Sequence, residues 1–182
     1  EIQNMYLPLL VNGKILFYVG EVGSEEKLLE APKIKGEKLL VGPIKFQAKK
    51  KGEILDYEIN ARLFLDLESE DAKVGLYSKD VKVYDSVAEL DESLGQCELW
   101  TCGKIRGFVN EPSLSLVLGR EAIKDTLQSN AGKALIQELY SLHERLWPEI
   151  KEKLQSKTTD DNNKLIKDIM PHLIEGYQLG DP

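Results

Sequence analysis

The chain has 182 residues, with 24 Lys and Arg against 31 Asp and Glu, for a net charge of −7. This length suits one ordinary domain or two small ones, with a core that needs no disulfides. The acidic balance excludes a protein whose whole surface binds phosphate backbones. No apolar run reaches the roughly 20 residues of a membrane span, and no signal-peptide pattern opens the chain, so we expect a soluble, cytoplasmic protein or a piece of one.

The N-terminal part predicts a hairpin followed by a linker. Two apolar runs flank the Asn12-Gly13 pair, which favours the positive backbone angles of a tight hairpin turn. We therefore expect strands near 5–11 and 14–19. Residues 20–37 are rich in glycine, proline and charge, which is typical of a surface connection.

The next segment predicts a long antiparallel hairpin with one solvent-exposed face, because apolar and polar residues alternate on both sides of a Lys51-Gly52 turn. The apolar positions of this alternation are Ile44, Phe46, Ala48, Tyr57, Ile59, Ala61, Leu63 and Leu65. The acidic residues 66–73 break the pattern and indicate a solvated loop. Beyond them, the run VGLYSKDVKVYDS (74–86) predicts two strands or one long bent strand.

Two further elements are expected before the predicted structure changes from strands to long helices. A short helix is predicted over 86–94, because Asp85 or Ser86 can accept hydrogen bonds from the free amides of its first turn. A strand is predicted over 97–110, where Gly103 and Gly107 leave room for a close backbone approach.

The last third of the chain predicts helices. Apolar residues recur at helical spacing between positions 135 and 154, and Trp147-Pro148 is expected to kink or restart the helix. A polar gap at 156–163 is expected to separate a final amphipathic helix over 164–177.

Strands first and helices afterwards predict an α+β fold, with an antiparallel or mixed sheet packed against helices and a helical extension behind it. We divide the chain into an N-terminal hairpin and linker (1–37), an α+β domain (38–128) and a helical extension (129–182).

The Cys and His residues form no recognisable site. Cys97 and Cys102 are five apart, so in a strand they would point to opposite faces and be poor disulfide partners. His143 and His172 are too far apart to make a zinc spacing with these thiols. No glycine falls in a phosphate-binding loop pattern. We predict no metal site and no independent nucleotide site.

One region carries a family resemblance. A strand with Leu76-Tyr77 precedes a second strand, a short helix, and the run GFVNEPSLSLVLGRE (107–121), which opens a long helix. Residues 75–125 thereby resemble the middle region of the heat-shock protein 90 chaperones, and ARLFLD (61–66) is similar to the strand that precedes it in that family. YLPLLVNGK near the start looks like the exit of an ATP-binding domain in divergent members, so the resemblance implies a segment that follows such a domain.

The resemblance implies a role for Arg120, which would reach the γ-phosphate of ATP held by a separate N-terminal domain. A planar, permanently charged guanidinium suits the charge that spreads over a transferred phosphoryl group. Lys124, one helical turn later, is a candidate second phosphate contact. Val117 and Gly119 stand where the family has asparagine and serine. ATP and Mg²⁺ are thus implied for the full-length protein, with none bound by this chain alone.

The resemblance also implies partners: the upstream ATP-binding domain, unfolded client proteins, and a second copy in a full-length homodimer, with no nucleic acid and no membrane. Trp100, Phe108 and Trp147 are candidates for a client-binding patch, although strand and helix-stripe positions favour the core. Two alternatives stay open. One is the transducer domain of a gyrase B-like or mismatch-repair (MutL-like) ATPase that acts on DNA, and the other is an interaction module without ATPase coupling.

Overall fold

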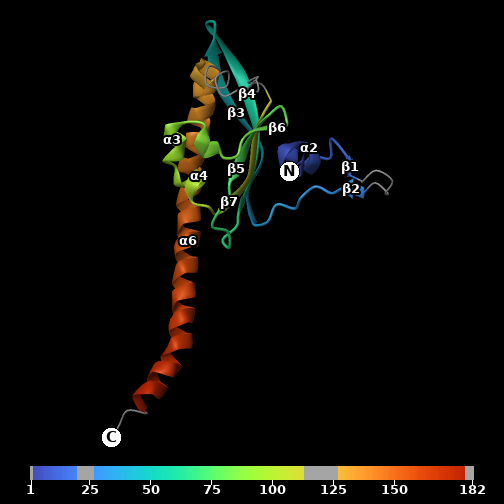
Figure 1. The fold of residues 1–182 in the computed structure, drawn as a ribbon. Helices are drawn as coiled ribbons and strands as arrows, with labels where there is room; N and C mark the ends of the chain where they lie inside the picture. The colour runs from blue at the N-terminus through green and yellow to red at the C-terminus, as the bar shows by residue number, and fades with distance from the viewer. Residues whose placement is uncertain (1, 20–26, 113–126, 179–182) are drawn as a thin grey trace. The chain divides into compact units, whose positions relative to one another are not determined.

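The structure is a computed structural model, which describes residues 2–19, 27–112 and 127–178. Its fold is α+β, as the order of strands and helices predicts (Figure 1). In chain order the elements are α1 (Ile2–Met5), α2 (Leu7–Val11), β1 (Phe17–Val19), β2 (Lys27–Leu29), β3 (Glu37–Lys50), β4 (Glu53–Leu65), β5 (Val74–Ser78), β6 (Val81–Tyr84), a 3-10 helix η1 (Val87–Glu89), α3 (Glu92–Gly95), α4 (Glu98–Thr101), β7 (Ile105–Glu111) and α6 (Asn130–Gln178).

Five strands form one mixed sheet in the order β3-β4-β7-β5-β6, while β1 and β2 pair separately. β5 and β7 are parallel, and the other neighbours in this sheet are antiparallel. The β3–β4 hairpin is confirmed, with Lys51 and Gly52 at φ 51° and 91° in its two-residue turn. β7 lies in the middle of the sheet, although it is the last strand in sequence.

Helices lie on both sides of this sheet. Figure 1 shows α3, α4 and the first part of α6 along one side, and α2 on the opposite side. The hydroxyl of Tyr77 on β5 donates to the backbone carbonyl of Asn4 in α1. Arg62 on β4 donates to Oδ1 of Asn12 at 2.7 Å. The core on the α6 side includes Ile59, Leu63, Leu76, Val109, Leu94, Leu99, Leu135, Leu139 and Leu142.

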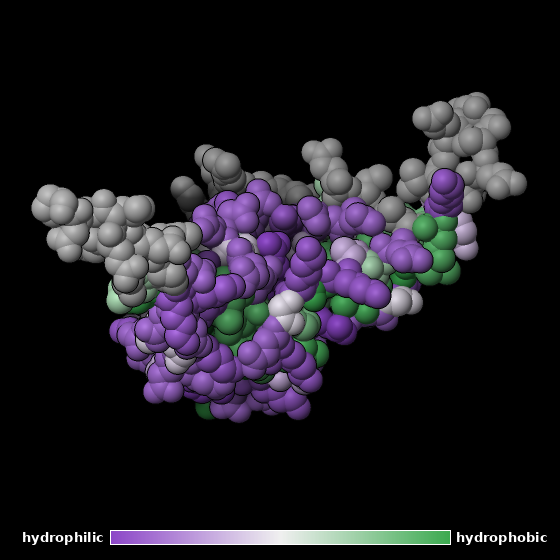
Figure 2. Space-filling model, turned by 90° about the horizontal axis from the view of Figure 1, so that it is seen from below, coloured by the Kyte–Doolittle hydropathy of each residue, from purple (hydrophilic) through white to green (hydrophobic). Residues whose placement is uncertain are grey.

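The chain divides into two compact units, Glu1–Arg145 and Leu146–Pro182. The second unit is the continuation of α6, on which four apolar side chains are exposed: Leu165, Ile166, Ile169 and Met170. Within the described parts of the chain, no helix has the length and apolar character that crossing a membrane requires. Hydrophilic residues cover most of the face in Figure 2.

The predicted N-terminal hairpin is wrong, because residues 7–11 form helix α2. The Asn12-Gly13 pair ends this helix instead of turning a hairpin. The amide of Gly13, at φ +66°, donates to the carbonyl of Leu10, and the amide of Lys14 donates to Leu9, which is a Schellman motif. The positive φ at Gly13 was predicted correctly, but a helix end requires it as much as a type I′ turn does.

One other boundary also differs from the prediction. The strand predicted over 97–110 starts only at Ile105, because α4 occupies 98–101. Ser86 does cap the short helix η1, accepting a hydrogen bond from the amide of Ala88 at 3.2 Å. The cysteines that were placed on opposite faces of a strand lie instead at the two ends of α4, and both are free.

The final helix does not start separately at residue 164, since α6 runs unbroken through both Pro148 and the polar segment 156–163. This segment is polar but contains neither glycine nor proline. The hydroxyls of Thr158 and Thr159 donate to carbonyls four residues earlier, at 3.0 Å each. Because the segment lacks both strong helix breakers, its polarity alone does not end the helix.

Candidate functional site

The two residues predicted to contact phosphate, Arg120 and Lys124, lie outside the described residues, as do Val117 and Gly119. The structure therefore describes the elements on either side of the segment 113–126, but not the segment itself.

The strand that leads into this segment is fixed at its end. Asn110, only 5% exposed, donates from Nδ2 to Oδ1 of Asp80 at 2.6 Å, and its own Oδ1 accepts from the amide of Asp80 at 3.0 Å. The carbonyl of Glu111, which is fully buried, accepts from the amide of Lys79 at 3.1 Å. These bonds clamp the end of β7 to the β5–β6 turn.

The helix that follows the segment also begins at a fixed point. Ser129 caps α6, because its Oγ accepts from the amide of Gly132 at 3.1 Å and its carbonyl accepts from Lys133 at 2.9 Å. Asn130 donates from Nδ2 to the carbonyl of Lys49, near the tip of the β3–β4 hairpin, at 3.0 Å. Both ends of the segment that carries Arg120 are thus held within the first unit.

Trp100 and Phe108 are buried at 3% and 1% exposure. Both therefore belong to the core, which removes them from the candidates for a client-binding patch. Apolar surface is found instead around the small β1–β2 sheet, at Leu16, Tyr18 and Leu28. The sequence alternation did not reveal this surface, because these residues were assigned to a hairpin and a linker.

A cleft of about 460 Å³ opens on the side of the sheet that α1 and α2 occupy. Its lining concentrates positive charge in a chain whose net charge is −7. Five cationic side chains and two carboxylates line it: Lys33, Lys35, Lys73, Lys82, Arg106, Asp71 and Asp85. The lining therefore carries a net charge of +3.

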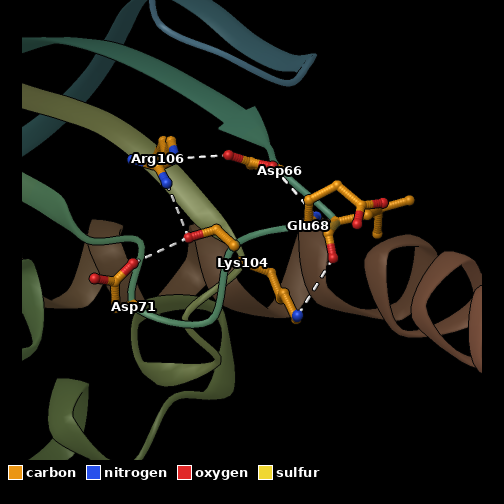
Figure 3. Close-up of polar contacts among 7 residues, drawn as sticks. Asp66, Glu68, Asp71, Lys104 and Arg106 are labelled. Carbon is orange, nitrogen blue, oxygen red and sulfur yellow. Dashed lines mark hydrogen bonds and ion pairs between the residues drawn. The ribbon is translucent and has the colours of Figure 1, made fainter.

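Arg106 is held in place by a polar network at one end of the cleft, which Figure 3 shows. Its Nε donates to Oδ2 of Asp66 at 2.7 Å, and one terminal nitrogen donates to Oγ of Ser69 at 3.0 Å. Asp66 also accepts from the amide of Glu68 at 3.2 Å. The hydrogen bond from Arg106 is the main reason that the pKa of Asp66 lies below its ordinary value of 3.8.

The acidic loop 66–73 is thus not simply solvated. Lys104, just before β7, donates to the carbonyl of Leu67 at 3.3 Å, and the amide of Ala72 donates to the carbonyl of Gly103 at 2.9 Å. These contacts tie the loop to β7. The bonds between Asp66 and Arg106 were missed because the two residues are 40 positions apart in sequence.

We expect Asp66→Asn to destabilise the protein at pH 7, because it removes the charge that pairs with Arg106. The ionised carboxylate contributes stability that is complete above the ordinary pKa of 3.8 and is lost as the pH falls through the lower folded pKa. The difference in the free energy of unfolding between the unaltered protein and Asp66→Asn should therefore shrink as the pH falls below about 4. Urea unfolding of both proteins from pH 7 to pH 2 measures this difference.

Asp161→Asn is the control for this experiment, because Asp161 is exposed on α6 and forms no ion pair with the described residues. It should leave the urea midpoint unchanged at every pH. A loss of stability in Asp66→Asn that is as large at pH 2 as at pH 7 would contradict the stabilising role of the charge on Asp66.

The opposite end of the cleft is formed by β5 and β6. Lys82 and Asp85 form an ion pair at 2.7 Å, and the hydrogen bond from Lys82 lowers the pKa of Asp85. Tyr77 stays a hydrogen-bond donor at neutral pH, because burial, with a smaller effect of Asp85, raises the pKa of its phenol. Its bond to Asn4 holds α1 against this end of the cleft.

Neither metal nor thiol chemistry is indicated in the described part of the chain. No group of three or more His, Cys, Asp or Glu residues there is arranged to hold a metal ion. Burial raises the pKa of the thiols of Cys97 and Cys102, so both are protonated at neutral pH and are poor nucleophiles.

No protein-family model matches this chain, and no curated protein shows significant sequence similarity to it.

Proposed function

We propose that this chain is the ATPase-coupling middle segment of a heat-shock protein 90-like chaperone. In this proposal it docks on an ATP-binding domain, presents Arg120 to the γ-phosphate, and passes the nucleotide state to a client or partner protein. The full-length protein uses ATP and Mg²⁺ and works as a homodimer. The chain gates hydrolysis and does not hydrolyse ATP by itself.

The order of elements supports this proposal. A strand with Leu76-Tyr77 (β5) leads to a second strand (β6) and to the short helices η1 and α3, then β7 precedes a long helix (α6). This is the order that the resemblance to the chaperone family implies.

The observation that carries the proposal is that both ends of the segment 113–126 are anchored. Asn110 and Glu111 end a central strand in fixed contacts, and Ser129 and Asn130 fix the start of α6. A residue supplied to another domain's active site needs such supports, since an error of about 1 Å costs roughly 100-fold in rate.

ATP hydrolysis measured with separate domains tests the proposal. The chain alone should show no turnover, the upstream ATP-binding domain should turn over slowly, and mixing them should raise the rate by at least about tenfold, because the mixture completes the site. A mixture no faster than the ATP-binding domain alone would favour the interaction module without coupling. Salt-sensitive DNA binding by the chain would favour the gyrase B-like alternative.

A further inference from the structure

We propose that the cationic cleft between α1, the segment 32–35 and the strands β5, β6 and β7 binds the phosphate groups of a small phosphorylated molecule. The residues from which the site is argued do not belong to the segment 113–126, and the inference does not depend on ATPase coupling. It rests on the charge of the cleft, on the fixed position of Arg106 and on the size of the cavity.

Three of the cleft lysines have no close partner. Lys33, Lys35 and Lys73 form no hydrogen bond or ion pair with the residues that the structure describes. Lys35 and Lys73 act only at longer range, where they help to lower the pKa values of Asp66 and Asp85. Like charges gathered in a cleft repel one another, and an anion relieves this repulsion. The chain's overall negative charge makes such a local concentration more significant.

Arg106 offers the directional part of the site. Of the five N–H donors of its guanidinium, Asp66 and Ser69 use two, and the side chain is 40% exposed. Because these bonds hold the side chain in place, little rotamer entropy remains to be lost when a ligand binds. The remaining donors are suited to phosphate oxygens, for which arginine is the preferred residue.

The strand at the base of the cleft is shaped to leave room. A Cβ at Gly75 would lie 2.9 Å from the ring of Tyr77, so the ring could not stay where it is beside any other residue, whereas the 3.5 Å to Cε of Lys82 is an ordinary contact. Tyr77 in turn bonds to Asn4 and fixes the α1 wall.

Cavity size and lining indicate the class of ligand. A volume of about 460 Å³ falls in the range of about 300–1,000 Å³ that holds small organic ligands. Leu7, Pro32 and Ile34 add apolar surface beside the cationic residues. A net charge of +3 suits two or three phosphate groups, and the apolar residues suit an organic moiety. The geometry points to a ligand of the kind represented by a nucleoside diphosphate.

Isothermal titration of the 182-residue chain with sodium tripolyphosphate and with ADP, at about 0.15 M salt, tests the site. Both probes should bind with a dissociation constant below about 1 mM. The double variant Lys35→Gln/Lys73→Gln should bind tripolyphosphate about tenfold more weakly, because two phosphate contacts are lost. Both lysines are exposed, so circular dichroism should show an unchanged fold.

Lys45→Gln/Lys49→Gln is the matched control, since it removes the same charge from exposed positions on β3 that do not line the cleft. It should weaken binding less than twofold. Three results would overturn the proposal: no binding of either probe, an equal loss in the control, or tighter binding of a penta-glutamate peptide than of tripolyphosphate. The last result would assign the cleft to an acidic protein segment.

Discussion

Replacing Gly107 by alanine should destabilise the protein by about 4 kcal/mol, the sum of backbone strain and a steric clash. Gly107 lies on the central strand β7 at φ +137°, a conformation that side chains rarely adopt. A Cβ at this position would overlap the backbone carbonyl oxygen of Arg62 on β4. The neighbouring strand would have to move, and β4 pairs with β7 over six residues from Asn60 to Leu65.

Gly42→Ala is the matched control for this prediction. Gly42 has a similar φ of +148°, but no atom lies within 4 Å of a Cβ built there. It should therefore lose only the strain, about 1–2 kcal/mol. Urea unfolding of the two variants at pH 7 separates these contributions. Equal losses in the two variants would mean that the close approach of β7 to β4 does not matter for stability.

The β3–β4 hairpin was predictable from sequence, because two local signals agree. The alternation from Ile44 to Leu65 assigned the buried face, and the Lys51-Gly52 pair placed the turn. Phe46, Ile59 and Leu63 are buried as this alternation requires. Such signals succeed where one strand face is buried, since a shift of one residue would expose the whole apolar set.

The N-terminal prediction failed because one signal fits two structures. A positive φ at Gly13 is needed at a helix end and in a hairpin turn alike, and the choice depends on contacts with distant residues. Asn12 accepts a hydrogen bond from Arg62, 50 positions away. No local pattern contains this contact.

The cationic cleft could not be predicted for a similar reason. Its lysines come from a linker (Lys33, Lys35), from the end of a loop (Lys73) and from an edge strand (Lys82), each of which is unremarkable in sequence. They are brought together only once β5 pairs in parallel with β7 and α1 packs on the sheet. The pairing of strands that are far apart in sequence therefore creates the site, whereas the local composition of each segment indicates only a solvated surface.

Under the proposed coupling role, Arg120→Ala should lower the turnover number for ATP of the full-length protein by about 10³-fold, the lower end of what such arginines contribute. This corresponds to about 4 kcal/mol of transition-state stabilisation. Phosphoryl transfer spreads negative charge over three oxygens, and a guanidinium from the docked segment would stabilise that charge only at the transition state. The effect should therefore appear in the turnover number at saturating ATP more than in the Michaelis constant.

Arg145→Ala provides the control, because Arg145 is an exposed arginine of α6 whose hydrogen bond and ion pair among the described residues are with Glu138, at 3.4 Å. Turnover at saturating ATP in these two variants and in the unaltered full-length protein is the most direct measurement of ATPase coupling. A drop of about 10³-fold in Arg120→Ala with Arg145→Ala unchanged is the expected result. Equal turnover in all three proteins would contradict the coupling role.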